Sequence, residues 1–228
     1  MGREGRRVTV IVILGAPGAG KGTQAVLLAE RLGIPHVATG DLFRAAVRDS
    51  SPIGLEARRF MERGQLVPDD ITIRMLLERL SKPDAADGAI LDGFPRNSAQ
   101  AAALDRALAD RGERVDLAVD IDVPTEELVQ RMSGRYVCRD AGHVYNESTN
   151  PPRVPGICDI DGSELVQRED DKAETIRTRL DVQLASLREV VDHYASTGIL
   201  RTVDGIGPID DVAAAIDDVV RGVADSAG

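Results

Sequence analysis

Short apolar runs alternate along the chain with segments in which apolar residues recur every three or four positions. Five of the runs are aliphatic or β-branched, and most end at Gly, Asp or Thr, as buried strands commonly do. These predicted strands are Val8–Leu14, Pro35–Ala38, Ala89–Leu91, Asp116–Val123 and Ile199–Val203. Because strands and helices alternate, we expect an α/β fold, with a five-stranded parallel sheet and helices on both faces.

Helical spacing is clearest in three of the intervals between these strands. Gly22–Leu32 is predicted to be a helix, with Val26, Leu27 and Leu32 at helix-compatible spacing. Asp69–Leu80 and Glu174–Tyr194 show longer apolar stripes with the same period. Each of these helices would cover the sheet with its apolar side.

Two stretches interrupt the alternation. Residues 39–67 are helical and polar with no strand, whereas residues 134–171 are rich in Gly, Pro, Asp and Asn, have no helical period and contain both cysteines. An irregular insert of about 38 residues is unusual in a compact domain unless it is a functional lid. We therefore divide the chain into a core (1–38, 68–133 and 172–228), a first insert (39–67) and a lid (134–171).

Composition narrows the function classes. Acidic residues outnumber basic ones by 38 to 28, which gives a net charge of −10 and argues against non-specific binding to nucleic acid or anionic membranes. Two cysteines are too few for a disulfide framework and fit a reducing cytoplasmic compartment. The apolar run near the N-terminus precedes a glycine-rich loop instead of a cleavage site, so we expect no signal peptide, and no apolar run is long enough for a transmembrane helix.

The decapeptide GAPGAGKGTQ, from Gly15 to Gln24, carries the strongest chemical signal. It lies between a predicted strand and a predicted helix, which is the setting of a phosphate-binding loop. The glycines allow backbone N–H groups to converge on anionic oxygens, and the helix N-terminus adds partial positive charge. Lys21 would reach the outer phosphates of a nucleotide, and the Thr23 hydroxyl would lie near its metal ion.

The spacing in this loop departs from the plain signature GxxxxGKS/T, because Gly22 separates the lysine from the threonine. The form GxPGxGKGT is typical of adenylate kinases and related nucleoside-monophosphate kinases. Further matching motifs follow in order: ATGDLFR (38–44), GQLVPDD (64–70), LDGFPRNSAQ (91–100), GRYVC (134–138) and QREDD (167–171). Together they cover nearly the whole chain, which therefore resembles the long-lid adenylate kinases of bacterial type.

The resemblance implies a P-loop NTPase fold, in which the first insert binds the nucleoside monophosphate. It also implies reversible phosphoryl transfer from MgATP to AMP, giving two ADP, by a cytoplasmic monomer that needs Mg²⁺ and no nucleic-acid or membrane partner. The positions that match ATP-binding residues are Gly18, Ala19, Gly20, Lys21, Gly22, Thr23, Arg131, Arg135, Val144, Tyr145 and Gly207. Those that match AMP-binding residues are Thr39, Arg44, Gln65, Leu66, Val67, Gly93, Phe94, Pro95, Arg96, Gln100, Arg168 and Arg179. The implied catalytic residues are Lys21, Arg96, Arg135, Arg168 and Arg179, and Thr23 and Asp92 would hold magnesium through water.

The chemistry agrees with this arginine-rich set. Phosphoryl transfer asks the protein mainly for alignment and charge neutralisation. A phosphate acceptor is already largely ionised at neutral pH, so no general base is required. The sequence offers no candidate Ser-His-Asp set, and we expect His36 to be a packed or surface histidine without a catalytic role.

The lid motif raises the question of a metal. Many long-lid relatives carry four ligands there, as a CxxC pair in each half. The residues at these positions that can bind a metal are Cys138, Cys158 and Asp161. The fourth position is Ala141, and neither Asp140 nor His143 has matching spacing. Since structural zinc almost always has four protein ligands, the sequence argues against zinc and predicts two buried thiols in a lid held by hydrogen bonds and packing.

Two alternatives remain beside the adenylate kinase hypothesis. A UMP or CMP kinase is a close one, although such relatives usually have a short lid. A nucleotide-binding regulator without turnover belongs to another class and would be expected to lack Lys21 or the lid arginines, which are present. A GTPase would need a guanine-specifying NKxD motif, and the sequence has none.

Overall fold

The computed structural model describes residues 9–61, 67–148, 150–167 and 173–225. All five predicted strands form, and each strand begins and ends within one residue of its predicted position. They are β1 (Thr9–Gly15), β2 (His36–Ala38), β3 (Gly88–Asp92), β4 (Val115–Asp122) and β8 (Leu200–Asp204). Every pairing among them is parallel and their order is β2-β3-β1-β4-β8, which confirms the predicted five-stranded sheet.

The strand order determines where a ligand can bind. The chain leaves β1 for one side of the sheet and later crosses to the other, so β1 lies at the point where the direction of winding reverses. Ligands of such sheets bind outside the carboxyl ends of the strands at this point. The register aligns these ends, because Ile13 in β1 pairs with Asp92 in β3 and Leu14 pairs with Asp120 in β4.

Helices cover both faces of the sheet, as predicted. The helices α1 (Lys21–Leu32), α6 (Thr125–Ser133) and α8 (Ile209–Asp225) share one apolar core with it, and α4 (Asp69–Leu80) and α5 (Ser98–Ala109) share another. The long helix α7 (Ala173–Ser196) contributes to both cores. A short 3₁₀ turn, η1 (Pro83–Ala85), leads into β3. The helices α5, α6 and α8 are not among those predicted from the sequence.

Two of the three apolar residues that indicated α1 are not on its buried side. Val26 and Leu32 are 43% and 36% exposed, whereas Ala25, Leu28 and Ala29 are buried. Two alanines on the inner side allow the helix axis to lie close to the sheet. The period therefore predicted the helix correctly, but the larger apolar side chains are not the ones that face the sheet.

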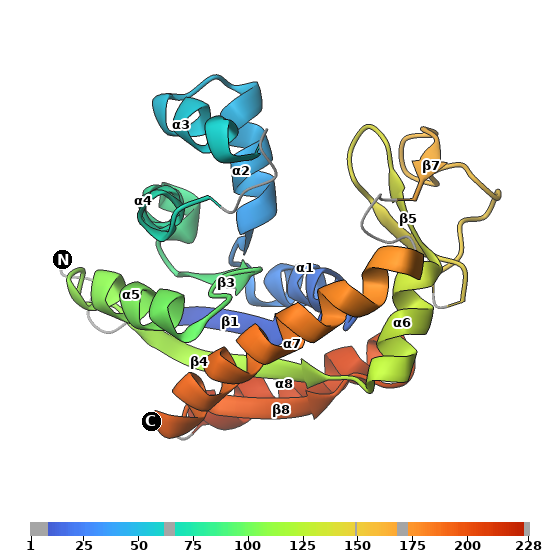
Figure 1. Ribbon diagram of the computed structural model, residues 1–228. Coiled ribbons are helices and arrows are strands. Elements are labelled where there is room, and N and C mark those ends of the chain that lie inside the picture. Colours follow the sequence, from blue (N-terminus) through green and yellow to red (C-terminus); the bar gives the residue numbers. More distant parts are fainter. Residues whose placement is uncertain (1–8, 62–66, 149, 168–172, 226–228) are drawn as a thin grey trace.

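The first insert forms two helices, α2 (Thr39–Arg48) and α3 (Pro52–Met61), and its described residues contain no strand, as expected. These helices pack against α4 through a small cluster around Ala57, Ile71 and Met75. Figure 1 shows α2 and α3 as an arm on one side of the molecule and the lid as a second arm on the other, both rising from the same side of the sheet.

The lid is more ordered than the sequence predicted. Instead of an irregular segment it contains an antiparallel sheet of β5 (Arg135–Cys138), β6 (Val144–Asn146) and β7 (Leu165–Val166), in the order β6-β5-β7. These strands are two to four residues long, too short for an alternating pattern to stand out. Hydrogen bonds from Asn146 Nδ2 to Arg131 O (2.8 Å) and from Gln167 Nε2 to Ser133 O (2.9 Å) fasten the lid to α6.

The described helices were also compared with the requirements of a membrane span. Among the described residues, no helix combines the length and the apolar character needed to cross a bilayer.

Candidate active site

The glycine-rich loop follows β1 directly and leads into α1 at Lys21. Three of its glycines have positive φ: 141° at Gly15, 87° at Gly18 and 93° at Gly20. A Cβ on Gly15 would lie 2.9 Å from the Ile121 carbonyl oxygen, and a Cβ on Gly18 would lie 3.0 Å from Met132 Cγ. The loop therefore rests directly on β4 and α6, and only glycine fits at these two positions.

The Lys21 side chain lies over this loop. Its Nζ donates a hydrogen bond of 2.9 Å to the carbonyl oxygen of Ala16, so the ammonium group is held where the loop turns. Ala19 is buried and donates its N–H to the same carbonyl oxygen at 3.1 Å. Thr23 is exposed in the first turn of α1. This arrangement matches the phosphate-binding loop predicted from the sequence.

Asp92, at the end of β3, lies beside the start of α1. Its Oδ2 atom is 3.5 Å from the point where a Cβ on Gly22 would be, and 3.3 Å from His36 Nε2. His36 was expected to be a packed or surface histidine, and it is instead a neighbour of this carboxylate. The signal lay in the topology: His36 opens a strand that pairs with β3, where it is opposite Ile90, two residues before Asp92 and on the same face of the sheet.

A second cluster forms where the chain leaves β3. The Gly93 carbonyl oxygen accepts hydrogen bonds from Thr39 Oγ1 (3.1 Å) and Arg96 Nε (2.8 Å). Thr39 is buried and Arg96 is exposed, and both belong to the motifs matched to AMP binding. Phe94 and Pro95, which separate Gly93 from Arg96 in the sequence, are both buried and are joined by a cis peptide bond. The structure thus brings motifs from two separate segments to one place.

Gln100 is held firmly beside this cluster. Its Oε1 accepts a hydrogen bond from the backbone N–H of Arg96 (2.7 Å), and its Nε2 donates to Asp69 Oδ1 (2.7 Å). Its backbone N–H donates to Oδ1 of Asn97, the N-cap residue of α5 (2.8 Å). Each end of a side-chain amide can make one more hydrogen bond. A contact between Gln100 and a nucleobase therefore stays a prediction.

Arg131 joins α6 to the loop after β8. Its guanidinium donates to the Gly205 carbonyl oxygen (3.0 Å) and to Glu127 Oε1 (2.8 Å). A Cβ on Gly205 would lie 2.5 Å from Val123 Cγ2, so this loop is packed tightly against the end of β4. Gly207 follows in the same loop, is exposed and has a φ of 114°. Arg131 and Gly207, two of the positions matched to ATP binding, thus lie at the same loop.

The lid places two predicted ATP residues differently. Val144 is 47% exposed and free of the lid core, whereas Tyr145 is buried in it. The Tyr145 hydroxyl accepts from the Asp159 N–H (2.8 Å) and lies 3.4 Å from Cys158 Sγ. The Tyr145 ring therefore belongs to the interior of the lid, and a contact with ATP could involve only its backbone.

Several predicted residues cannot be placed by their side chains. Arg44 and Arg179 lie on α2 and α7, but their side chains are outside the described set. Gln65, Leu66 and Arg168 lie outside the described residues altogether. Of the remaining AMP and lid positions, Val67 is half-buried beside α4 and Arg135 begins β5.

Asp120 is a charged residue that the sequence analysis missed because it lies within a predicted strand. It pairs in register with Leu14, directly before the phosphate-binding loop. Burial and the neighbouring Asp122 raise its pKa, while Lys21 acts in the opposite direction. No described residue hydrogen-bonds the buried Oδ1 atom of Asp120. The Asp120 carboxylate is therefore close enough to sense the charge of Lys21.

Both lid cysteines are buried, as predicted, but their neighbourhood is richer than the motif suggested. One ligand atom from each of Cys138, His143, Cys158 and Asp161 lies within 4.8 Å of the others. His143, which does not have the spacing of the motif, lies within this group, with its Nδ1 atom 3.3 Å from Cys158 Sγ. Hydrogen bonds from Cys138 and Ser163 hold the pKa of Asp161 well below its ordinary value.

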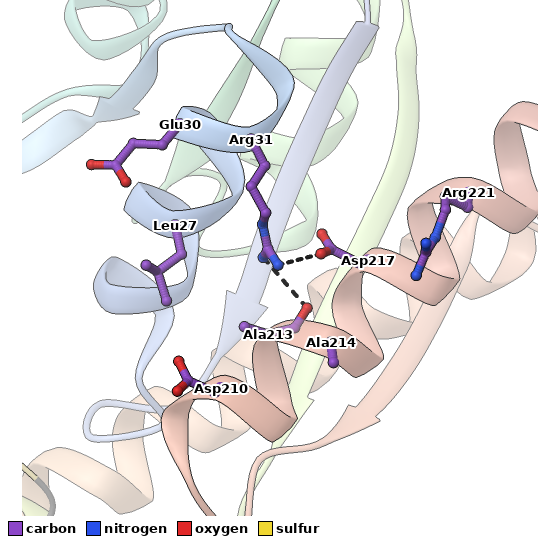
Figure 2. A pocket seen from close by; sticks show the side chains of 8 residues that line it. All are labelled: Leu27, Glu30, Arg31, Asp210, Ala213, Ala214, Asp217 and Arg221. Atoms are coloured by element: carbon purple, nitrogen blue, oxygen red, sulfur yellow. Dashed lines mark hydrogen bonds and ion pairs between the residues drawn. The ribbon is translucent and has the colours of Figure 1, made fainter.

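A further hollow lies between α1 and α8, as Figure 2 shows. It has a volume of about 280 Å³, and an ion pair between Arg31 and Asp217 crosses it. Arg31 also donates to the Ala213 carbonyl oxygen at 3.4 Å. None of the predicted nucleotide-binding residues lines this hollow.

Comparison with known proteins identifies relatives along most of the chain. A family model described as adenylate kinase matches residues 13–199. The chain is 49% identical to the adenylate kinase of Carboxydothermus hydrogenoformans over 211 residues, which cover 92% of this chain and 99% of that protein. It is 52% identical to the adenylate kinase of Exiguobacterium sibiricum over 202 residues, or 89% of this chain and 94% of that protein. The adenylate kinase of Streptomyces griseus is 49% identical over 205 residues, or 90% of this chain and 94% of that protein.

Proposed function

The chain belongs to the adenylate kinase family, and on this premise we propose that it reversibly transfers the terminal phosphoryl group of ATP to AMP, forming two ADP. The observation that carries the proposal is the meeting of two sites at one edge of the sheet. The loop bearing Lys21 lies at the end of β1, and the cluster of Thr39, Gly93 and Arg96 lies at the end of the adjacent β3. One site suits a donor triphosphate and the other an acceptor phosphate.

On the donor side, the glycines of the loop leave their backbone N–H groups accessible to phosphate oxygens, and the N-terminus of α1 adds partial positive charge. The Lys21 ammonium would exchange its hydrogen bond with the Ala16 carbonyl for the outer phosphates of ATP. Arg131 and the Gly205–Gly207 loop would contact the nucleoside end. Arg135, at the base of the lid, would complete the cationic surroundings.

On the acceptor side, Arg96 presents an exposed guanidinium whose Nε is anchored on the Gly93 carbonyl oxygen. A guanidinium suits the planar, bidentate recognition of a phosphate. Arg44 and Gln100 would contribute further contacts to AMP, and the first insert (39–67) would act as the monophosphate-binding arm. Arg168 and Arg179 would add positive charge between the two phosphates.

Magnesium fits the residues at the start of α1. Asp92 offers a half-buried carboxylate beside Gly22, and the exposed Thr23 hydroxyl is in the same helical turn. Oxygen ligands and water molecules are what Mg²⁺ prefers, and the ion would neutralise charge on the donor phosphates. His36, 3.3 Å from Asp92 Oδ2, would hold that carboxylate in place.

The reaction needs alignment more than proton transfer. AMP arrives largely ionised, so the protein has only to bring the two phosphates into line and surround them with cations. Water would compete with AMP as the acceptor in an open site. Closure of the lid (134–171) and of the first insert over the edge of the sheet would exclude it and strengthen the electrostatic interactions inside. We propose that the enzyme works as a cytoplasmic monomer without nucleic-acid or membrane partners.

The test is a panel of acceptors. Purified protein is mixed with ATP, Mg²⁺ and AMP, GMP, UMP or CMP, and diphosphate formation is followed. We expect fast turnover with AMP alone, loss of that turnover in Lys21→Ala, and retention in Lys82→Ala, which removes an exposed lysine far along the chain from the loop.

The other outcomes select among the alternatives. Preference for UMP or CMP would assign the enzyme to a sister class of kinases. Binding of ATP without turnover on any acceptor would favour a nucleotide-binding regulator. Equal activity in Lys21→Ala and the unmodified protein would indicate a contaminating kinase and contradict the role given to the loop.

A further inference from the structure

The side-chain amide of Gln100 lies between two groups of opposite hydrogen-bonding character. Its Oε1 atom accepts from the backbone N–H of Arg96 at 2.7 Å, and its Nε2 atom donates to Asp69 Oδ1, also at 2.7 Å. A backbone N–H can only donate, and an ionised carboxylate can only accept. The two neighbours therefore allow a single orientation of the amide, with its oxygen toward Arg96 and its nitrogen toward Asp69.

Rotation of this amide by a half-turn is strongly disfavoured. It would bring Nε2 against the Arg96 N–H and Oε1 against the Asp69 carboxylate, so that donor faces donor and acceptor faces acceptor. Gln100 is only 7% exposed, which leaves little room for water to replace the lost partners. Buried polar groups without partners are costly. The orientation of the amide is thus set by the protein before a ligand arrives.

The start of α5 explains why the side chain of Gln100 reaches Arg96. Asn97 is the N-cap residue of this helix, and its Oδ1 atom accepts from the backbone N–H of Gln100. In a capping box, a glutamine at this position bonds back to the N–H of the cap residue. Here it bonds to the N–H of the preceding residue, Arg96, whose Nε donates to the Gly93 carbonyl oxygen. The amide therefore belongs to the same hydrogen-bonded unit as the guanidinium proposed to bind the acceptor phosphate.

Asp69 comes from a different helix, because it is the first residue of α4. Its neighbour Asp70 lies in the same turn, where the helix dipole favours negative charge. The two carboxylates nevertheless have different partners: Asp69 accepts from Gln100, whereas Asp70 lies 3.8 Å from Arg74 on its own helix. The contact with Gln100 is thus a property of Asp69 and not of an acidic helix start in general.

The remaining capacity of the amide matches one type of base edge. Oε1 can accept one more hydrogen bond, and Nε2 can donate one more. Adenine offers an amino donor at N6 beside a ring-nitrogen acceptor, whereas guanine and hypoxanthine offer an acceptor at O6 beside an N1–H donor. In the same pose, a 6-oxopurine would set O6 against Oε1 and N1–H against Nε2. Only a 6-aminopurine makes both hydrogen bonds with the amide of Gln100 as it is oriented.

We propose that Asp69 is a positioning residue that fixes the Gln100 amide, and that it thereby makes the acceptor site select 6-aminopurine over 6-oxopurine monophosphates. The inference rests on the proposed function, in which Gln100 contacts the base of AMP, and it deepens that function by naming the group that sets the base preference. Asp69 acts without touching the nucleotide, because its effect passes through the orientation of one amide.

The test compares AMP with IMP as acceptors of the phosphoryl group of MgATP. The base of IMP has the 6-oxo pattern of guanine without its 2-amino group, so the two acceptors differ at this edge and hardly in bulk. We expect the original protein to prefer AMP in kcat/KM by at least roughly 100-fold. Asp69→Asn should lower this preference roughly tenfold, about the value of one hydrogen bond, because the new amide accepts either orientation while the Arg96 N–H still favours one.

The direction of the change identifies a positioning role. In Asp69→Asn, kcat/KM for IMP should rise while that for AMP stays close to its original value, because the new side-chain oxygen can still accept from Gln100 Nε2. A merely structural defect would lower both constants. Asp70→Asn is the matched control, since it removes the same charge in the same helical turn and should leave the ratio unchanged. KM for ATP and the circular dichroism spectrum should stay the same in both variants.

A double variant tests whether Asp69 acts through Gln100. Gln100→Met is similar in size and has no amide, so the preference for AMP over IMP should fall, and adding Asp69→Asn should not change it further. Where turnover is too slow to measure, calorimetric binding of AMP and IMP provides the same ratio. An effect of Asp69→Asn that persists without the amide would mean that Asp69 contacts the base itself, and it would overturn the proposal.

The other outcomes are equally decisive. An unchanged ratio in Asp69→Asn, with AMP still converted, would remove Asp69 from base selection. An equal change in Asp70→Asn would assign the effect to charge at the helix start and would also refute the proposal. An original protein that converts no AMP would contradict the proposed function, and the binding of AMP and IMP to Asp69→Asn, measured by calorimetry, would then decide the orientation argument separately.

Discussion

Replacement of Gly15 by alanine should damage both the fold and the donor site. Gly15 has a φ of 141°, in a region that is essentially restricted to glycine and costs other residues about 1–3 kcal/mol. The new Cβ would lie 2.9 Å from the Ile121 carbonyl oxygen and 3.2 Å from Ala19 Cβ. The carbonyl belongs to a central strand and cannot move freely, so overpacking adds about 1–3 kcal/mol. We expect a total loss of about 2–6 kcal/mol in the free energy of unfolding.

Gly33→Ala is the matched control. Gly33 ends the same helix that the loop begins, has a φ of 66°, and has open space where a Cβ would be. It should cost only about 1 kcal/mol for the left-handed backbone. Urea unfolding followed by far-ultraviolet circular dichroism gives both values, which suits a chain without tryptophan.

Enzyme kinetics provide the second half of this test. A displaced loop should raise KM for ATP in Gly15→Ala, while KM for AMP changes little, because the acceptor cluster is built on β3. Gly33→Ala should leave both constants near their original values. If the two variants lose stability within about 0.5 kcal/mol of each other, the steric argument for the loop is refuted.

Three further substitutions test other parts of the structure. No described residue hydrogen-bonds the Tyr194 hydroxyl, which is fully buried, so Tyr194→Phe should raise stability by about 0.5–1 kcal/mol in urea unfolding, and a clear loss would reveal a hidden partner. Because burial and Asp122 raise the pKa of Asp120, its ionised form opposes folding. Asp120→Asn should therefore raise the melting temperature at neutral pH, and this gain should shrink as the pH falls through the raised pKa; a pH-independent gain would contradict the reasoning. Arg131→Ala removes the hydrogen bond to the Gly205 carbonyl and should raise KM for ATP roughly tenfold, about 1.4 kcal/mol, whereas an equal rise for AMP would argue against an ATP-side role.

The sequence predicted best what depends on neighbouring residues. The five strands, the phosphate-binding loop and α4 follow from local apolar runs, glycine spacing and a helical period, and all are present. The positions of Thr39 and Arg96 required the family resemblance, because nothing in their local sequence places both on the Gly93 carbonyl.

The failures have physical reasons too. The buried side of α1 was misjudged because Ala25 and Ala29 are small, yet pack closer to the sheet than the larger Val26. The lid strands were missed because they are short. His143 did not have the spacing of the motif, and its place beside Cys158 depends on how the lid folds, which spacing along the sequence does not reveal.

The attachment of the lid has a consequence for how such enzymes can be altered. The lid has its own small core, and Asn146 and Gln167 attach it to the last turn of α6 through backbone carbonyl oxygens instead of particular side chains. Any incoming segment with amides at these two points could make the same bonds. We therefore expect that a relative's lid can be exchanged for this one while the sheet and its phosphate-binding loop stay intact.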